Sequence, residues 1–307
     1  MSKVVIVGSL NLDFVVQVAQ LPQRGETLPG SGFLTLPGGK GANQACAVGR
    51  LSQPGTAAMI GCVGMDVYGA QLQESLRAAG VNHRYVRGTM EAATGIALIL
   101  VETSGQNQIV VVPGANDCLL PADVTEAVSA LGGSHLLLQL ETPLETVIAA
   151  ATHARILGMT VILDPAPARP LPQELLSQVQ ILTPNESEAL ALIGAAGSEI
   201  KLADAPAIAR QLFALGPQQV ILKLGAQGAF FFDGAREQHF PARAVEAKDT
   251  TAAGDCFNGA LATGLSEGMT MDAAIAFANV AASISITRLG AQASLPTRTE
   301  VEQVFRL

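Results

Sequence analysis

The sequence contains no tryptophan, two tyrosines and four cysteines. So few aromatic rings leave little material for stacking the bases of single-stranded nucleic acid. The cysteines lie far apart without CxxC spacing, and four thiols in 307 residues are not the framework of a disulfide-rich secreted domain. We therefore expect reduced thiols and a cytoplasmic protein. The cysteines are Cys46, Cys62, Cys118 and Cys256.

Positive charge is also scarce. The chain has 18 Lys and Arg residues against 26 Asp and Glu residues, a formal net charge of −8, and the basic residues are scattered. This pattern argues against a nucleic-acid-binding surface. A phosphate ligand is still compatible with it, because backbone amides and a few cations can hold one whatever the net charge.

Long hydrophobic runs are missing too. No run approaches the length of a membrane span, and the apolar stretch from Val4 to Gly8 is too short for the core of a secretory signal. We predict no membrane partner. The histidines have no metal-ligand spacing, so they are assigned no chemistry; they are His83, His135, His153 and His239.

The chain does have the apolar material for a large core, with 49% hydrophobic and 14% charged residues. No linker divides it, so residues 1–307 are expected to form a single domain with a small appendage. Apolar runs alternate with helix-like stretches, which predicts an α/β domain with a mostly parallel sheet and ligands beyond the carboxyl ends of its strands. The predicted strands are 4–7, 57–60, 136–140, 161–163, 181–182 and 220–222, and the predicted helices are 42–51, 68–79, 121–130, 143–157, 186–193, 205–215, 254–266 and 271–288.

Two stretches break this alternation. Residues 14–36 and 95–112 have little helical periodicity and contain short strand-like runs with turns. We expect them to form a small antiparallel sheet that stands off the main body and acts as a lid.

The segment Asp249-Thr250-Thr251-Ala252-Ala253-Gly254-Asp255 precedes a helical apolar pattern. The small residues at 252–254 let a ligand approach the main chain, and the amides of a first helical turn attract anionic oxygen. Asp255 is then placed to take a proton from an alcohol. The alternative is that Asp249 or Asp255 only caps the helix and Gly254 only makes the turn. Cys256 is expected to pack in the helix.

A second glycine-rich segment, Gly38-Gly39-Lys40-Gly41-Ala42-Asn43, also opens a predicted helix. It does not fit the Walker A pattern, because Gly41 stands where Ser or Thr belongs. The turn after the first strand, Gly8 to Asp13, lacks GxGxxG, so the P-loop and dinucleotide-binding fingerprints are both excluded.

Five motifs occur in the order found in one known family: Asn11-x-Asp13, the segment 38–43, Thr183-Pro184-Asn185-Glu186 with Glu188, Leu224-Gly225-x-x-Gly228, and the segment 249–255. From Val4 to Pro296 the chain resembles the ribokinases, within the ribokinase-like family of carbohydrate and nucleoside kinases.

This resemblance implies a three-layer α/β/α fold with a mostly parallel central sheet and a small β-sheet lid. The implied activity is ATP-dependent phosphorylation of D-ribose at O5. One alternative is a kinase of the same fold that acts on deoxyribose, another pentose or a nucleoside. A second is a sugar- or nucleotide-binding regulator without catalysis.

The resemblance also implies roles for single residues. Asp255 would be the general base, and the amides of Ala252, Ala253 and Gly254 would stabilise charge on the transferred phosphoryl group. The alternative to sugar binding by Asn11 and Asp13 is an Asx turn that ends the strand. The alternative for Lys40 is a solvated side chain in a turn. The sugar site would comprise Asn11, Asp13, Gly39, Lys40, Gly41, Asn43, Glu141 and Asp255.

For the nucleotide, the resemblance implies a turn with Gly225 and Gly228 beside the ribose and base. Lys223 stands where the family leads us to expect threonine, and its ammonium could reach a phosphate. Glu188 would hold Mg²⁺ through water, although Asn185 and Glu188 could instead only cap a helix. The implied nucleotide-binding residues are Asn185, Lys223, Leu224, Gly225, Ala226, Gln227, Gly228, Gly254 and Asn279, the last in place of an expected histidine.

The family also uses a monovalent cation, usually K⁺, and commonly forms dimers through the lid, so we expect a homodimer. The alternative for Asp249 is that it accepts ordinary backbone hydrogen bonds. Residues matching the K⁺ site are Asp249, Thr251, Ser285, Arg288, Gly290 and Ser294.

Overall fold

The computed structural model describes residues 3–103 and 106–305. Within these residues the larger sheet has the strand order β13-β12-β11-β10-β9-β8-β1-β4-β5. Its neighbours from β11 to β5 are parallel, and the β11–β12 and β12–β13 pairs are antiparallel. The strands are β1 (Val4–Val7), β4 (Ala57–Gly64), β5 (Asn82–Thr89), β8 (His135–Leu138), β9 (Thr160–Leu163), β10 (Ile181–Leu182), β11 (Gln219–Lys223), β12 (Ala229–Phe232) and β13 (Glu237–Phe240).

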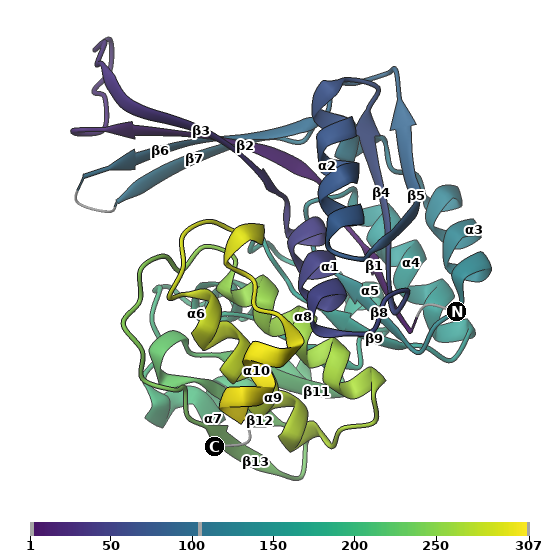
Figure 1. The fold of residues 1–307 in the computed structure, drawn as a ribbon. Helices are drawn as coiled ribbons and strands as arrows, with labels where there is room; N and C mark the ends of the chain where they lie inside the picture. Colours follow the sequence, from purple (N-terminus) through teal and green to yellow (C-terminus); the bar gives the residue numbers. More distant parts are fainter. Residues whose placement is uncertain (1–2, 104–105, 306–307) are drawn as a thin grey trace.

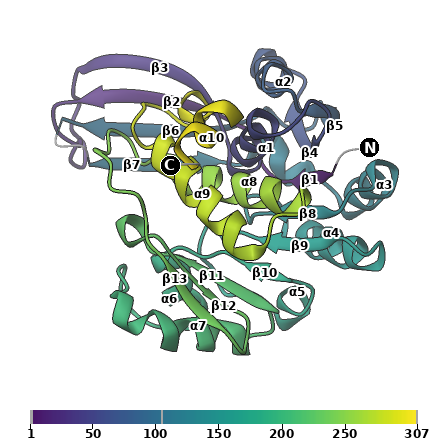
Figure 2. The ribbon, with the colours of Figure 1, turned by 60° about the horizontal axis from the view of Figure 1, so that its bottom comes forward.

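Helices cover both faces of this sheet, which gives the expected three-layer α/β/α architecture (Figures 1 and 2). One face packs against α1 (Lys40–Leu51), α2 (Val67–Ala78), α8 (Ala253–Ser266), α9 (Met271–Ser285) and α10 (Arg298–Phe305). The other packs against α3 (Pro121–Leu131), α4 (Leu144–Ile156), α5 (Gln173–Leu176), α6 (Glu186–Leu192) and α7 (Ala205–Ala214). Short 3₁₀ turns lie at Gly114–Cys118, Leu202–Asp204, Gly225–Gln227 and Gln292–Ser294.

The central strands are buried on both faces, because Val4, Val5, Ile6 and Val7 are all 0% exposed. Continuous burial of this kind explains why short unbroken apolar runs predicted these strands.

The predicted helices and strands are all present, with ends displaced by a few residues. The largest error is β4, which was expected to end at Ile60 but continues to Gly64. The last long helix was expected to reach Arg288 but ends at Ser285. The carbonyl of Ile286 accepts the amides of Lys248 and Asp249 instead of continuing the helix. Sequence reasoning did not find β5, β12, β13, α5 or α10.

The smaller sheet has the order β3-β2-β6-β7 and extends away from the main body (Figure 1). Its strands are β2 (Asn11–Val18), β3 (Gly30–Gly38), β6 (Gly95–Glu102) and β7 (Asn107–Val112). The two predicted lid segments thus pair with each other, although residues 104 and 105 lie outside the described residues. The expected antiparallel pairing is confirmed for β2–β3 and β6–β7, whereas β2 and β6 are parallel. The hairpin-like turns within each segment do not reveal how the two hairpins join.

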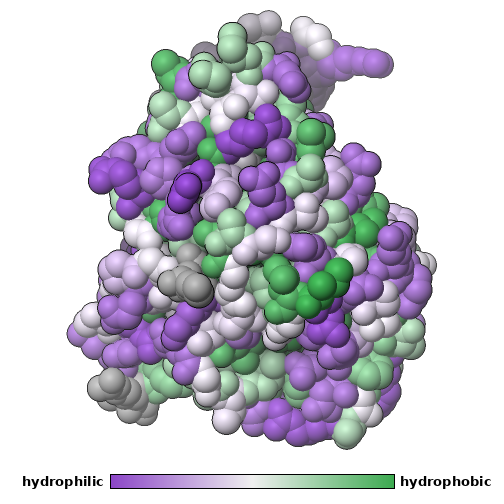
Figure 3. All heavy atoms as spheres, turned by 90° about the vertical axis from the view of Figure 1, so that its right-hand side faces the viewer, coloured by the Kyte–Doolittle hydropathy of each residue, from purple (hydrophilic) through white to green (hydrophobic). Residues whose placement is uncertain are grey.

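The smaller sheet exposes many large apolar side chains. Seven of its residues are 43% to 62% exposed: Phe33, Leu34, Leu98, Ile109, Val110, Val111 and Val112. By contrast, the face of the molecule in Figure 3 is mostly hydrophilic, with hydrophobic side chains in small separate groups. In the described part of the chain, no helix has the length and hydrophobicity to cross a membrane.

Candidate active site

Polar residues follow the carboxyl ends of five neighbouring parallel strands. Glu141 follows β8, Asp164 follows β9, Asn185 follows β10, Ser9 follows β1 and Lys223 ends β11. Because these strands run in the same direction side by side, the topology gathers all five residues at one edge of the sheet.

The amino terminus of α8 meets this edge. Ala252, the residue before the helix, has a left-handed φ of 58°, and α8 begins at Ala253. An alanine is rarely held in this conformation, so the backbone turn is a specific feature of the loop. The amides of the first turn have no acceptor within the helix and are suited to an anion.

A cavity of about 350 Å³ opens at the start of α8. It brings together the loop before α8 with the ends of β9, β10 and β11. Its lining includes Lys40, Asp164, Ala166, Asn185, Glu186, Ser187, Glu188, Lys223, Gly225, Thr250, Ala252, Ala253, Gly254 and Asp255.

The Asp255 side chain is 6% exposed and lies in the wall of this cavity. Asn43 Nδ2 donates to its Oδ2 at 2.9 Å, and Gln44 Nε2 donates to its Oδ1 at 3.0 Å. Burial raises the pKa of Asp255 to about 6; the charge of Asp164 adds to this rise, and Lys40 with the two amide donors opposes it. A carboxylate with a pKa near neutrality is suited to accept a proton.

The residues predicted to hold the sugar lie on the lid side of Asp255. Glu141 Oε2 accepts hydrogen bonds from Ser9 Oγ at 2.6 Å and from the Lys40 amide at 3.1 Å. Burial raises the pKa of Asp13 to about 7, and the charges of Glu141 and Asp255 add to the effect. Asp13, Glu141 and Asp255 are therefore close enough to interact.

Two glycines allow this packing. A Cβ on Gly39 would lie 2.7 Å from the Asn11 amide nitrogen, and a Cβ on Gly41 would lie 2.7 Å from the carbonyl carbon of Gly8. Gly39 also has φ 87°. The start of α1 thus rests directly on the turn after β1, which brings residues 11, 13, 39–41 and 43 together.

A buried hydrogen-bond acceptor in this region has no donor among the described residues. This acceptor is Asn43 Oδ1. Buried polar atoms are normally satisfied, so this oxygen is a natural acceptor for a ligand hydroxyl.

Asn116 is a residue that sequence reasoning missed. Its Nδ2 donates to Asn11 Oδ1 at 2.7 Å, and its Oδ1 accepts the Leu10 amide at 2.9 Å. It therefore fixes the side chain of Asn11 from a turn about a hundred residues later in the chain, where no sequence motif marks it.

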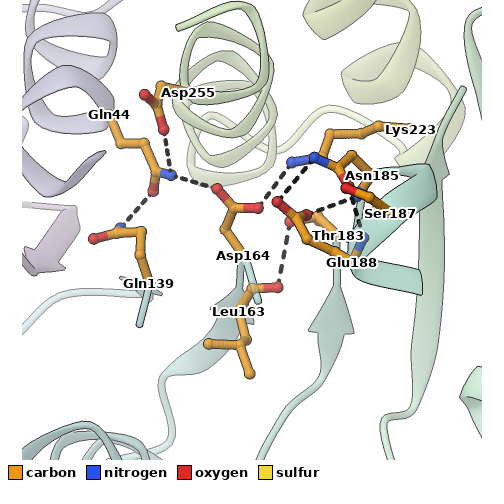
Figure 4. A network of polar contacts seen from close by, with 10 residues as sticks. All are labelled: Gln44, Gln139, Leu163, Asp164, Thr183, Asn185, Ser187, Glu188, Lys223 and Asp255. Atoms are coloured by element: carbon orange, nitrogen blue, oxygen red, sulfur yellow. Dashed lines mark hydrogen bonds and ion pairs between the residues drawn. The ribbon is translucent and has the colours of Figure 1, made fainter. Parts of the chain in front are cut away.

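Gln44, Gln139 and Asp164 were also missed, and they link the two sides of the site (Figure 4). Gln44 Nε2 donates to Asp164 Oδ2 at 2.9 Å as well as to Asp255, and Gln44 Oε1 accepts from Gln139 Nε2 at 2.5 Å. Lys223 Nζ forms an ion pair with Asp164 Oδ1 at 2.8 Å. A continuous chain of polar contacts thus runs from Asp255 to Lys223.

The predicted nucleotide turn borders a second cavity of about 340 Å³, which shares Glu186 and Gly225 with the first. Leu224, Gly225, Ala226 and Gln227 line it. Gly228 has φ 95° and follows this turn. Asn279 lies outside the linings of both cavities, and its Nδ2 donates to the carbonyl of Phe240 at 3.1 Å.

Asn185 and Glu188 form the capping arrangement that the sequence left open. Asn185 Oδ1 accepts from the Glu188 amide at 2.8 Å and from Ser187 Oγ at 2.9 Å. The two Glu188 oxygens accept from Asn185 Nδ2 at 2.9 Å and from the Asn185 amide at 2.8 Å. Burial raises the pKa of Glu188, an effect that Lys223 opposes and Asp164 reinforces. The cap does not remove Glu188 from the cavity, which it lines.

Asp249 joins the two segments predicted to hold K⁺. The amide of Thr251 donates to Asp249 Oδ1 at 2.9 Å, and the amide of Gly290 donates to Oδ2 at 2.8 Å. Burial alone would raise the pKa of Asp249, but these bonds outweigh it and lower the pKa. The backbone-bonded alternative is thus present, and the loop still holds a negative charge at neutral pH.

The other residues of this predicted site have local partners. Ser285 Oγ and Ser294 Oγ each donate to a carbonyl three residues earlier, at 2.9 and 2.8 Å. The Arg288 guanidinium pairs with Glu300 at 2.5 Å. Among the residues that the structure describes, no group of three or more His, Cys, Asp or Glu side chains is arranged to hold a metal ion.

The sequence of this chain is similar to those of known carbohydrate kinases. The sequence pattern described as pfkB family carbohydrate kinase matches residues 1–298. The chain is 40% identical to the ribokinase of Bacillus subtilis over 306 residues, covering 99% of this chain and all of the relative. It is 39% identical to the ribokinase of Schizosaccharomyces pombe, covering 100% of this chain and 99% of the relative.

Solved structures agree with the sequence comparison. A crystal structure of Thermotoga maritima ribokinase superimposes with a TM-score of 0.90 at 38% identity, and covers all of both chains. Arabidopsis thaliana ribokinase complexed with ribose and ATP superimposes with a TM-score of 0.89 at 33% identity, again over both whole chains. This protein therefore belongs to the pfkB family of carbohydrate kinases.

Proposed function

We propose that this protein transfers the γ-phosphoryl group of ATP to the 5-hydroxyl of D-ribose. The observation that carries the proposal is the place of Asp255, which lies in the cavity wall within the first turn of α8 and accepts a hydrogen bond from the buried amide of Asn43. The names of the full-length relatives, and the relative solved with ribose and ATP, favour this substrate pair.

The residues of this chain supply the parts that the reaction needs. Asp255 accepts the proton of the sugar hydroxyl while the hydroxyl oxygen forms a bond to the γ-phosphorus. The bond between the γ-phosphorus and the bridging oxygen breaks, and the electrons leave with ADP. The amides of Ala252, Gly254 and Asp255 and the ammonium of Lys223 stabilise the negative charge on the phosphoryl oxygens, whereas the Ala253 amide donates to the Thr250 carbonyl at 3.2 Å.

The sugar-side residues are proposed to read the hydroxyl groups of ribose. Asp13 and Glu141 offer carboxylates, and Asn11 and Asn43 offer amides, at fixed positions. A sugar that lacks one hydroxyl leaves one of these buried groups unpaired, which costs binding free energy. Lys40, from the cavity wall, adds a positive charge beside Glu141 and Asp255.

Mg²⁺ is proposed to bind with the triphosphate, held by Glu188 through water. Each Glu188 oxygen accepts one hydrogen bond from Asn185, so each has a second lone pair that can accept from a metal-bound water. Magnesium retains most of its water, so a single carboxylate and substrate phosphates are adequate ligands. Bound there, it neutralises charge on the phosphates.

K⁺ is proposed to bind in the loops joined by Asp249, where that carboxylate stays ionised and backbone oxygens of residues 251, 285, 288, 290 and 294 are the candidate ligands. We further propose that residues 1–307 act as one kinase domain in the cytoplasm, with the β3-β2-β6-β7 sheet as its lid. The exposed apolar side chains of that sheet support a homodimer formed through the lid.

The test is a substrate screen with purified protein, ATP and Mg²⁺, in which ADP formation is coupled to NADH oxidation. D-ribose should give the highest kcat/KM, ahead of 2-deoxyribose, other pentoses and nucleosides, and ¹³C and ³¹P NMR should locate the new phosphate on C5. A higher kcat/KM for deoxyribose or a nucleoside would reassign the substrate. ATP binding without turnover on any of them would identify a regulator.

A further inference from the structure

Asp164 lies between two groups that act on different reactants. Its Oδ1 holds the Lys223 ammonium at 2.8 Å, and its Oδ2 accepts from Gln44 Nε2 at 2.9 Å. The same Gln44 nitrogen donates to Asp255 Oδ1 at 3.0 Å. Figure 4 shows the two carboxylate oxygens of Asp164 in contact with different residues, one with Gln44 and the other with Lys223.

The orientation of the Gln44 amide is fixed by chemistry. An amide nitrogen has two hydrogens, and here one faces each carboxylate, while the amide oxygen accepts from Gln139 Nε2. A flipped amide would place its oxygen against the carboxylates of Asp164 and Asp255, and its nitrogen against the donor of Gln139. Gln44 is therefore a rigid bridge that holds two acids at a set separation.

All of these groups are withdrawn from water. Gln44 is 0% exposed and Asp164 is 2% exposed. The Lys223 side chain is 12% exposed. A buried carboxylate without a partner is strongly unfavourable, so the Lys223 charge offsets the desolvation of Asp164 at this position. Conversely, Asp164 restrains a long side chain that would otherwise have many rotamers.

The restrained ammonium lies at the phosphate side of the cavity. Lys223 Nζ is 3.3 Å from the point where a Cβ on Gly254 would stand. Gly254 belongs to the first turn of α8, whose amides are suited to bind an anion. An anionic group bound there meets both the amides and the ammonium.

We propose that Asp164 and Gln44 are positioning residues that hold the phosphate-binding ammonium of Lys223 and the proton-accepting carboxylate of Asp255 in one fixed arrangement. The proposal rests on the proposed kinase function and names a coupling within its site. Asp164 touches neither reactant in this account; it acts through Lys223 on one side and through Gln44 on the other.

The test is a double-mutant cycle with Asp164→Asn, Lys223→Met and the combined variant. Each single change should lower kcat by on the order of 10-fold to 100-fold, because a small displacement of reacting groups is costly. The combined variant should lose much less than the product of the two single losses, because the two residues act as one unit. Lys223→Arg should recover part of the activity, since it restores the charge.

The matched control is the exposed ion pair of Arg236 with Asp272, neither of which lines the cavity. Arg236→Met with Asp272→Asn should leave kcat and KM unchanged. Thermal unfolding of every variant shows that the protein measured is folded. Multiplicative losses in the cycle, or an Asp164→Asn kcat equal to that of the control, would overturn the proposal.

Turnover by the wild type distinguishes a failure of the coupling through Asp164 from a failure of the proposed kinase function. If the wild type phosphorylates no sugar, the kinase function fails, and the same cycle is then measured on the Kd for ATP by calorimetry. Lys223→Met should weaken ATP binding, with an effect that changes severalfold when Asp164 is already replaced. Independent effects on Kd would refute the coupling.

Discussion

Asn43, on α1, donates through its side-chain amide to Asp255, on α8, at 2.9 Å, and the two residues are 212 positions apart in the sequence. This contact joins the two glycine-bearing helix starts that stand out in the sequence. One helix start contributes groups suited to a sugar, and the other contributes amides suited to a phosphoryl group. Their meeting is the reason why Asp255 can serve both reactants.

The raised pKa of Asp255 predicts the acid side of the pH–rate profile. A general base must be ionised, so with a pKa of about 6, kcat/KM for ribose should fall about tenfold per pH unit well below pH 6 and level off above it. Lys40 lowers this pKa and Asp164 raises it. The fall in kcat/KM on the acid side should therefore move to higher pH in Lys40→Met and to lower pH in Asp164→Asn. Steady-state kinetics from pH 4.5 to 9 measure all three profiles. A wild-type profile that stays flat down to pH 4.5 would remove Asp255 from the role of base.

Much of this arrangement was accessible from the sequence, because short range patterns encode it. The buried apolar runs predicted the parallel strands, and residues 38–43 and 249–255 predicted two helix starts suited to ligands. Gln44, Asn116 and Asp164 were not found, since they act through partners 59 to 211 residues away, and such contacts leave no local pattern. The β2–β6 pairing was missed for the same reason.

Two glycines of the site should respond differently to alanine. In Gly41→Ala the new Cβ meets the backbone of Gly8 and Ser9 at 2.7 Å, so the main chain must shift at a cost of about 1–3 kcal/mol and Tm should fall by several degrees. In Gly254→Ala the nearest atom is the side-chain nitrogen of Lys223 at 3.3 Å, which needs to shift by only a few tenths of an ångström, so Tm should hold or rise.

Gly254→Ala, the variant expected to keep its Tm, should be the one that impairs the use of ATP. The methyl group of Gly254→Ala stands where phosphate must approach, and kcat/KM for ATP should drop at least about tenfold. Scanning calorimetry measures the Tm of both variants, and initial rates at varied ATP concentration measure their kcat/KM for ATP. Unchanged ATP kinetics in Gly254→Ala would mean that the phosphate does not bind at this helix start.

The Asp249 loop predicts activation by potassium. Replacing KCl by tetramethylammonium chloride at constant ionic strength should lower kcat severalfold, because the large organic cation cannot enter a site of backbone oxygens. Asp249→Asn, which removes the ionised carboxylate between Thr251 and Gly290, should abolish most of this difference. Equal rates in both salts for the wild type would exclude a functional K⁺ site.

The lid predicts a dimer that a single charge disrupts. Ile109 and Val110 are 53% and 61% exposed, and as neighbours on β7 they point to opposite faces of the sheet. If one face is the interface, Ile109→Lys and Val110→Lys should differ, one giving a monomer and the other staying dimeric. Light scattering after size exclusion at micromolar concentration measures the mass. A monomeric wild type, or two dimeric variants, would contradict assembly through the lid.

The most direct test of the whole account is Asp255→Asn, which keeps the shape of the side chain and removes its capacity to accept the proton. We predict a kcat reduced at least about 100-fold, as expected for loss of a general base, with the Kd for ribose by calorimetry changed only a few-fold. Asp272→Asn, an exposed residue at the start of α9, should behave as the wild type. An Asp255→Asn variant that turns over ribose within tenfold of the wild type would contradict the central claim.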